Sequence, residues 1–350
     1  MTRCMQFAFA RVQVAASHGT RRLVRSGLLA LASVIVAFTA ASPPGAAAEG
    51  QADQQAGAAQ PLAKLTSLGS TRTLEVLPLV DWNVANASLR GEAGVSYLVR
   101  TDRSTILFDV GGNLESSDPS PLVANMRQLG IKLADIDTIV ISHGHTDHVG
   151  GLQFARAKTF SLDSKQGDLQ GKRVYVPMPM TYPGIEPVVV QGPMVIAPGV
   201  ATIGPIPTKI YMGPVNEQAL AIQVEGKGIV LIVGCGHQGV SRLMERADEL
   251  FDAPIHGVVG GLHYPVPRGR LVNKEGIDQQ RWSSYGPGTG PTPEDVQRDI
   301  ELIAGKGPQW VSLSPHDSSD EMIEAFRTKF GARFHDLRVG EAQVIAGAKP

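Results

Sequence analysis

The apolar and polar positions of the first half of the chain alternate in short runs that are typical of β-strands. β-Branched and aromatic residues gather in four such runs, at residues 74–80, 95–99, 104–108 and 136–142. Between the last two runs the spacing changes to that of a helix. Ser120 is a suitable N-cap, Pro121 suits the first helical position, and Gly130 ends the periodic pattern. The first half therefore predicts a strand-rich meander with one helix.

The second half predicts strands that alternate with helices. Residues 174–215 are rich in Pro, Val and Gly, which indicates meandering strands and turns. A hairpin is expected where two apolar runs flank Glu-Gly-Lys-Gly, and Thr292 begins a helix with capping-box character. The remaining elements are strands at 219–224, 229–233, 255–259 and 310–313, helices at 240–251 and 321–330, and a terminal strand. Meanders followed by this alternation favour an α/β sandwich with mixed sheets.

Composition and charge narrow the class of protein. The chain has 350 residues, of which 43% are hydrophobic and 19% charged, so it can bury a large core. Its formal net charge is −1, but residues 1–48 carry five arginines and no acid, which leaves the remainder at about −6. This balance gives no indication of a nucleic-acid partner or of an anionic membrane surface, and it indicates no oligomeric state.

The first 48 residues are predicted to be an export signal. A basic stretch ends at Arg25, residues 27–40 are almost wholly apolar, and Ala46-Ala47-Ala48 offers a cleavage site. The apolar run is shorter than the ~20 residues of a membrane span, so no stable membrane insertion is expected after processing. Arg21-Arg22 also resembles a twin-arginine signal. A periplasmic or secreted protein is expected, and an uncleaved anchor is the alternative.

The expected domain organisation follows from this leader. After residues 1–48, residues 49–70 are rich in Ala, Gln and Gly and are expected to form a disordered linker. Residues 71–350 are then the catalytic domain. Cys4 leaves with the leader, so Cys235 is the single thiol of the mature protein and has no disulfide partner within it.

The sharpest chemical signal follows directly on a predicted strand. Residues 143–148 read His-Gly-His-Thr-Asp-His, so three imidazoles and a carboxylate lie within six residues. Alternate residues of an extended segment project together, so His143 and His145 are expected to face one metal ion. Asp147 and His148 are expected to face a neighbouring ion. Such ligands suit Zn²⁺, with Mn or Fe as alternatives, and the pattern predicts a site for two divalent metal ions.

With Gly150-Gly151 after it, this motif resembles the metallo-β-lactamase superfamily, and the resemblance spans residues 72–345. Within the superfamily the chain is most similar to the branch related to dihydropterin-linked ribofuranosyl-aminobenzene phosphate synthases. That branch carries Gly-Cys-Ser-His-Ala-Gly, Gly-Gly-Phe-His and His-Cys-Thr-Gly. The chain reads Gly-Cys-Gly-His-Gln-Gly at 234–239, Gly-Gly-Leu-His at 260–263 and His-Asp-Ser-Ser at 316–319. The resemblance implies a four-layer αββα sandwich with mixed sheets and a metal-dependent hydrolase.

The resemblance also implies further ligands. His237 is expected as the third ligand of the first metal, or else as a polar cap of the helix that follows it. Cys235 lies where many superfamily members have a metal-bridging Asp, so it is either a thiolate ligand or a buried small apolar side chain. His316 matches the late histidine that completes the second site. His263 competes for that role and otherwise contacts the substrate or acts as an acid.

Three other features have expected roles. Asp109 resembles the superfamily carboxylate that orients the first histidine ligands, and a turn-stabilising Asp is the alternative. His256 and His335 lie in strand-like runs and are expected to be structural. The long loop at residues 264–291 is expected to be a substrate lid that offers Trp282 and Tyr285 as apolar contacts, or else a disordered insert.

The ligand set predicts hydrolysis of a small-molecule substrate. A metal ion lowers the pKa of bound water from 15.7 to ~7, which supplies hydroxide at neutral pH, and a second ion stabilises the developing anion. Asp147 and His263 are the expected catalytic groups. The bond is an ester-like, lactone, phosphoester or related bond. The alternatives are a redox or non-hydrolytic enzyme with iron on the same fold, and a metal-holding ligand-binding protein without turnover.

Overall fold

The computed structural model describes residues 62–284 and 290–347. The predicted export signal, the first part of the predicted linker and Tyr285 lie outside these ranges. Within them, no helix combines the length and the apolar character needed to cross a membrane.

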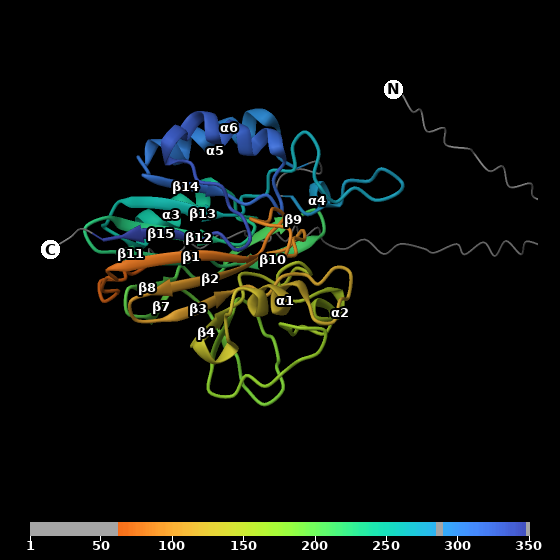
Figure 1. The fold of residues 1–350 in the computed structure, drawn as a ribbon. Coiled ribbons are helices and arrows are strands. Elements are labelled where there is room, and N and C mark those ends of the chain that lie inside the picture. The colour runs from red at the N-terminus through yellow and green to blue at the C-terminus, as the bar shows by residue number, and fades with distance from the viewer. Residues whose placement is uncertain (1–61, 285–289, 348–350) are drawn as a thin grey trace, which may run out of the picture. The chain divides into compact units, whose positions relative to one another are not determined.

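One mixed sheet contains seven strands in the order β15-β1-β2-β3-β4-β5-β6 (Figure 1). Pairing is antiparallel from β15 to β3 and parallel from β3 to β6. The strands are β1 (Thr73–Val80), β2 (Ser96–Thr101), β3 (Thr105–Phe108), β4 (Thr138–Val140), β5 (Arg173–Val176), β6 (Val188–Val189) and β15 (Gln343–Ala346).

The other large sheet contains six strands in the order β14-β13-β12-β11-β8-β7, and β12, β13 and β14 run parallel. Its strands are β7 (Met194–Ala197), β8 (Val200–Thr202), β11 (Leu220–Val224), β12 (Gly228–Val233), β13 (Ile255–Gly260) and β14 (Trp310–Leu313). A separate hairpin joins β9 (Ile206–Ile210) and β10 (Gly213–Glu217).

Helices cover the outer faces of both sheets. In Figure 1, α5 and α6 lie at the top against the six-stranded sheet, and α1 lies on the seven-stranded side. The helices are α1 (Pro121–Gln128), α2 (Leu152–Arg156), α3 (Val240–Leu250), α4 (Gln279–Trp282), α5 (Pro293–Gly305) and α6 (Asp320–Phe330), with short 3₁₀ turns at Leu133–Asp135 and Gly331–Arg333.

Three apolar layers separate these four layers of secondary structure. Strand β12 shows the arrangement: Leu231 packs in the cluster beneath α3, α5 and α6, whereas Val230 and Ile232 pack in the cluster between the two sheets. In β3, Phe108 joins the same central cluster, and Leu107 faces the cluster beneath α1. Both faces of these strands are buried, which explains their continuous apolar sequences. The predicted αββα sandwich with mixed sheets is therefore confirmed.

The strand order brings the polar loops to one edge of the sandwich. The carboxyl ends of parallel strands lie at the same edge of a sheet. Loop 143–148 follows β4, residues 235–237 follow β12, and His263 and His316 follow β13 and β14. Segments that are far apart in the sequence thus deliver their side chains to one place.

Residues 62–70, which the sequence assigned to the linker, pack against the domain. Leu62 and Leu65 contact the core cluster beneath the helices, and Leu68 is a buried member of it. The Leu65 amide donates to the carbonyl oxygen of Leu250 at 3.0 Å. These leucines cover apolar surface at the end of α3, so the folded part begins before the predicted boundary at residue 71.

Candidate metal centre

The loop at residues 143–148 has a fixed conformation at the end of β4. The His148 amide donates to the His145 carbonyl at 3.1 Å, and the Val110 amide donates to the His148 carbonyl at 3.1 Å. Gly150 follows with a φ of +89°, and a Cβ atom there would lie 2.2 Å from the Ser161 carbonyl oxygen. A glycine is therefore required where the loop packs against the next segment.

Three imidazoles from two loops form a first cluster. Nitrogen atoms of His143, His145 and His237 lie within 4.8 Å of one another. Nε2 of His143 and both ring nitrogens of His237 are buried without a hydrogen-bond partner among the described residues. Burial holds the pKa of His143 and of His237 well below the usual range, so both rings are neutral. Neutral imidazoles with unpartnered nitrogens are suited to bind a divalent metal ion.

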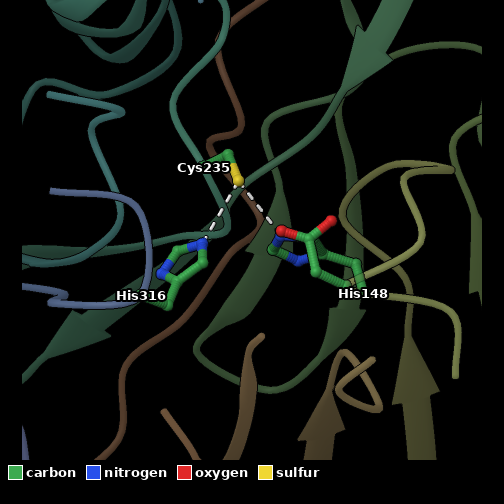
Figure 2. A group of neighbouring side chains, drawn as sticks. His148, Cys235 and His316 are labelled. Atoms are coloured by element: carbon green, nitrogen blue, oxygen red, sulfur yellow. Dashed lines mark hydrogen bonds and ion pairs between the residues drawn. The ribbon is translucent and has the colours of Figure 1, made fainter. Parts of the chain in front are cut away.

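A second cluster lies beside the first and contains Asp147, His148, Cys235 and His316. Figure 2 shows Cys235 between the two rings, with its Sγ 3.0 Å from Nε2 of His148 and 3.3 Å from Nε2 of His316. An Asp147 carboxylate oxygen lies 3.5 Å from Nε2 of His148. Burial opposes ionisation of Asp147, but the surrounding histidines outweigh it and keep its pKa below the usual range. The cluster therefore offers a carboxylate, two imidazoles and a thiol.

Asp109 holds one histidine of each cluster, His148 directly and His143 through the Ser142 hydroxyl. Its Oδ2 lies 2.8 Å from Nδ1 of His148 and accepts from the Ser142 hydroxyl at 2.7 Å. The same hydroxyl lies 2.9 Å from Nδ1 of His143. Both rings thus have Nδ1 occupied and Nε2 turned toward the clusters. This arrangement fixes ring direction and tautomer, the role expected for Asp109.

A second, similar relay supports His316. Nδ1 of His316 lies 2.6 Å from the Ser314 hydroxyl, which donates to Oδ2 of Asp81 at 2.7 Å. Tyr97 also donates to this carboxylate oxygen, at 2.9 Å. Asp81 is fully buried, and burial raises its pKa to about 6. The sequence analysis did not single out Asp81. Its position directly after the apolar run of β1 matches that of Asp109 after β3, and this similarity could have indicated it.

Glu217 shapes the loop that carries Cys235 and His237. One of its carboxylate oxygens accepts from the Cys235 amide at 2.9 Å and the Gly236 amide at 2.7 Å. The other accepts from the His237 amide at 2.8 Å. Burial raises the pKa of Glu217 to about 7. The sequence analysis missed this residue because nothing in the local pattern separates it from an ordinary polar strand end.

His263 borders both clusters. Its Nε2 donates to the Gln280 carbonyl at 2.8 Å, and its Nδ1 is buried with no hydrogen-bond partner in the described chain. Its ring centre lies 4.6 Å from that of His237, and it can share a ligand position with Cys235 and His237. Its amide donates to Asp317 at 2.9 Å. Asp317 lies 3.7 Å from Nε2 of His316, and its role beside the site was not foreseen in the sequence.

A cavity of about 270 Å³ opens onto these groups. Asp147, Cys235 and His263 contribute to its wall, and so do apolar side chains from four other segments. Leu271 and α4 belong to the loop at residues 264–291, so this loop contributes to the wall, and its action as a lid stays a prediction. Gln280 anchors α4, because its side-chain amide donates to the His316 carbonyl oxygen. The lining residues from outside the metal-ligand clusters are Leu114, Gly144, Thr146, Ala155, Met212, Leu271, Gln279, Gln280, Ser283 and Asp317.

The structure brings together all the residues predicted as metal ligands, and the number of ions that they hold stays a prediction. His256 and His335 lie apart from the clusters: His256 is part of β13, and His335 stacks on Trp310 with ring centres 3.6 Å apart.

The comparisons with known proteins agree with this geometry. Residues 89–160 match the family model of the metallo-beta-lactamase superfamily. A 7,8-dihydropterin-6-methyl-4-(beta-D-ribofuranosyl)-aminobenzene-5'-phosphate synthase of Methanocaldococcus jannaschii is 26% identical, over 57% of this chain and 80% of that protein. An uncharacterized protein of the same organism is 27% identical, over 53% and 77%.

One solved structure supports the fold directly. The crystal structure of Tm1679, a metal-dependent hydrolase of the beta-lactamase superfamily, aligns with a TM-score of 0.54 at 21% identity. The alignment covers 78% of this chain and 99% of that one. At this identity the similarity establishes the architecture, which is the one expected from the sequence.

Proposed function

We propose that the chain is a metal-dependent hydrolase of the metallo-beta-lactamase superfamily that works with two divalent metal ions on a small-molecule substrate outside the cytoplasm. The observation that carries the proposal is the set of buried, unpartnered nitrogen atoms on His143 and His237. Native proteins pair almost all buried polar atoms, so such a group calls for a ligand. One divalent ion would take a nitrogen atom from each of these histidines, and a second ion would take the thiol beside them.

The ligand assignment follows the two clusters. We assign His143, His145 and His237 to the first ion, since their nitrogen atoms converge. The second ion takes the other group, which consists of Asp147, His148, Cys235 and His316. A sulfur donor with imidazoles is a common set for Zn²⁺, and the carboxylate also accepts Mn or Fe. When bound, such ions act as Lewis acids and lower the pKa of coordinated water.

The protein's own groups can handle the protons of a hydrolysis. Asp147 lines the cavity in ionised form, so it can accept a proton from the attacking water. His263 donates through Nε2 to Gln280, which leaves the Nδ1 lone pair directed to the site. This atom can first accept a proton and then pass it to a leaving group. The supported bond class is an ester-like, lactone or phosphoester bond.

Export is part of the proposal and is supported by the first 48 residues. Their basic start, apolar run and Ala46-Ala47-Ala48 have the order of a cleaved signal peptide. N-terminal sequencing of the protein recovered from the periplasm or medium is expected to begin at Glu49. Full-length protein that stays in the cytoplasm contradicts the export proposal.

The metal assignment is tested by variants that separate the two clusters. His237→Ala is expected to lose one ion per chain, and His316→Ala the other, as measured by elemental analysis beside a panel of chromogenic esters, lactones and phosphodiesters. Turnover is expected to fall by at least about 100-fold in each variant, since each ion supplies several kcal/mol of transition-state stabilisation.

His256→Ala is the matched control, because this half-buried histidine lies in β13 and belongs to neither cluster. It is expected to keep both ions and the full rate. Two ions and full turnover in His237→Ala contradict the assignment.

A further inference from the structure

A second hollow adjoins the cavity at the metal centre. This groove measures about 700 Å³ and shares Leu114, Thr146 and Gln279 with that cavity. Thr146 belongs to the histidine motif itself, so the groove begins where a bond would be cleaved. A hollow of this size accommodates the part of a small-molecule substrate that extends beyond the reacting bond.

Apolar side chains stand exposed at this groove. Leu114 is 44% exposed and Leu152 is 52% exposed, and both line it. The segment that carries Leu114 is held in place by the half-buried Glu92. One carboxylate oxygen of Glu92 accepts from the Leu114 amide at 3.1 Å, and the other from the Gly112 amide at 2.8 Å. These two side chains lie in a groove that adjoins the metal-centre cavity, where they can contact the apolar part of a ligand.

One charged side chain, Arg156 of α2, is present among the described residues that line the groove. The others are glycines, leucines and neutral polar residues. Within residues 62–284 and 290–347, no carboxylate forms an ion pair with Arg156. A guanidinium without an acidic partner is complementary to an anion, which it binds through two parallel N–H groups.

We propose that the substrate is an amphipathic anion, with an apolar segment against Leu114 and Leu152 and an anionic end at Arg156. The proposal rests on the proposed function for the position of the reacting bond and adds the substrate class. Carboxylate, phosphate and sulfate ends share the chemistry that Arg156 recognises. The groove thus selects esters or lactones with a charged tail over neutral ones of equal length.

The test is a binding measurement that needs no turnover, so it stays informative even if every substrate panel is negative. The probes are 8-anilinonaphthalene-1-sulfonate and the similar neutral compound N-phenyl-1-naphthylamine, titrated against metal-loaded protein by fluorescence. Arg156→Gln is expected to weaken binding of the anionic probe by about tenfold, as for one lost charge-assisted hydrogen bond, and to leave the neutral probe unchanged. Leu114→Asn is expected to weaken both.

Two control variants make the same kinds of substitution outside the groove. Lys158→Gln removes an exposed cation two residues from Arg156 that does not line the groove. Leu302→Asn removes an apolar side chain of α5 that is 45% exposed, much like Leu114. Both are expected to leave both probes unchanged. An effect of Leu302→Asn equal to that of Leu114→Asn overturns the proposal, because the probe then binds elsewhere.

The result for Arg156→Gln shows whether Arg156 binds the anionic end of the ligand. Unchanged binding of the anionic probe, or equal weakening of both probes, overturns the assignment of Arg156. Competition by octanoate, octyl phosphate and octyl sulfate then identifies the preferred anion, since the best competitor should lose its advantage over octanol in Arg156→Gln. Octanol that competes as well as all three in the unaltered protein contradicts the substrate class.

Discussion

Replacement of Ser314 by alanine removes a single oxygen atom that connects the second cluster to a buried carboxylate. In the structure this hydroxyl lies 2.6 Å from Nδ1 of His316 and donates to Asp81 at 2.7 Å. Asp81 keeps its bonds from Tyr97 and from the Trp82 amide. The loss therefore falls mainly on His316, whose ring is no longer held with Nε2 toward Cys235.

The size of the effect follows from these contacts. A buried ring nitrogen left without a partner costs about 1–3 kcal/mol of unfolding free energy. Loss of a group that orients a metal-binding histidine lowers metal affinity by about 10–100-fold. The second ion should thus bind about 10–100-fold more weakly, while the first ion keeps its affinity, because the hydrogen bonds of the Ser314 hydroxyl go to Asp81 and His316.

Titration with Co²⁺ measures the two sites separately. Cys235 belongs to the second assigned set and not to the first, so the thiolate-to-cobalt charge-transfer band reports the second ion. The band of Ser314→Ala is expected to appear at higher Co²⁺ concentration. Ser142→Ala is the comparison, because its hydroxyl contacts His143 and also Asp109, which holds His148. It should weaken both ions. A Ser314→Ala protein that binds both ions with unchanged affinity refutes the reasoning.

Three further predictions concern stability. Glu217→Gln places an amide NH₂ against the His237 amide and should lower the unfolding free energy by about 1–3 kcal/mol in urea titrations; an unchanged midpoint speaks against the role of this carboxylate. Removal of metal by a chelator should lower the melting temperature, since ions bound to the folded state stabilise it. Equal melting temperatures with and without chelator contradict bound ions. Gly150→Ala should lower the unfolding free energy more than Gly130→Ala in denaturant titrations. Both glycines have a positive φ, but only a Cβ atom at Gly150 would meet the Ser161 carbonyl oxygen. Equal losses would mean that the backbone moves to make room for the Cβ atom.

Most of the fold was predictable because its central strands are continuous apolar runs and several of its helices carry local signals. The Ser120 cap of α1 and the capping box between Thr292 and Asp295 both form as expected. The helices α2 and α4 were missed. They contain five and four residues, too few for a periodic pattern to show.

The site was predictable where its ligands are close in sequence. The motif at residues 143–148 places three imidazoles and a carboxylate together before any tertiary contact is considered. The supporting carboxylates were harder to find, since they act across long separations. Ser314 reaches Asp81 over 233 positions, and Glu217 acts on backbone amides, which leave no trace in side-chain patterns. The folded arrangement of strand ends shows which groups Asp81 and Glu217 hold in place.

The central claim is that two divalent ions at this edge of the sandwich make the protein a hydrolase. Elemental analysis of the purified protein, beside turnover of chromogenic lactone, phosphodiester, sulfate and β-lactam substrates, tests it most directly. The account predicts about two zinc or manganese ions per chain and hydrolysis of at least one bond class. Protein that holds no metal when prepared without chelators, or that holds iron and hydrolyses none of the substrates, contradicts it.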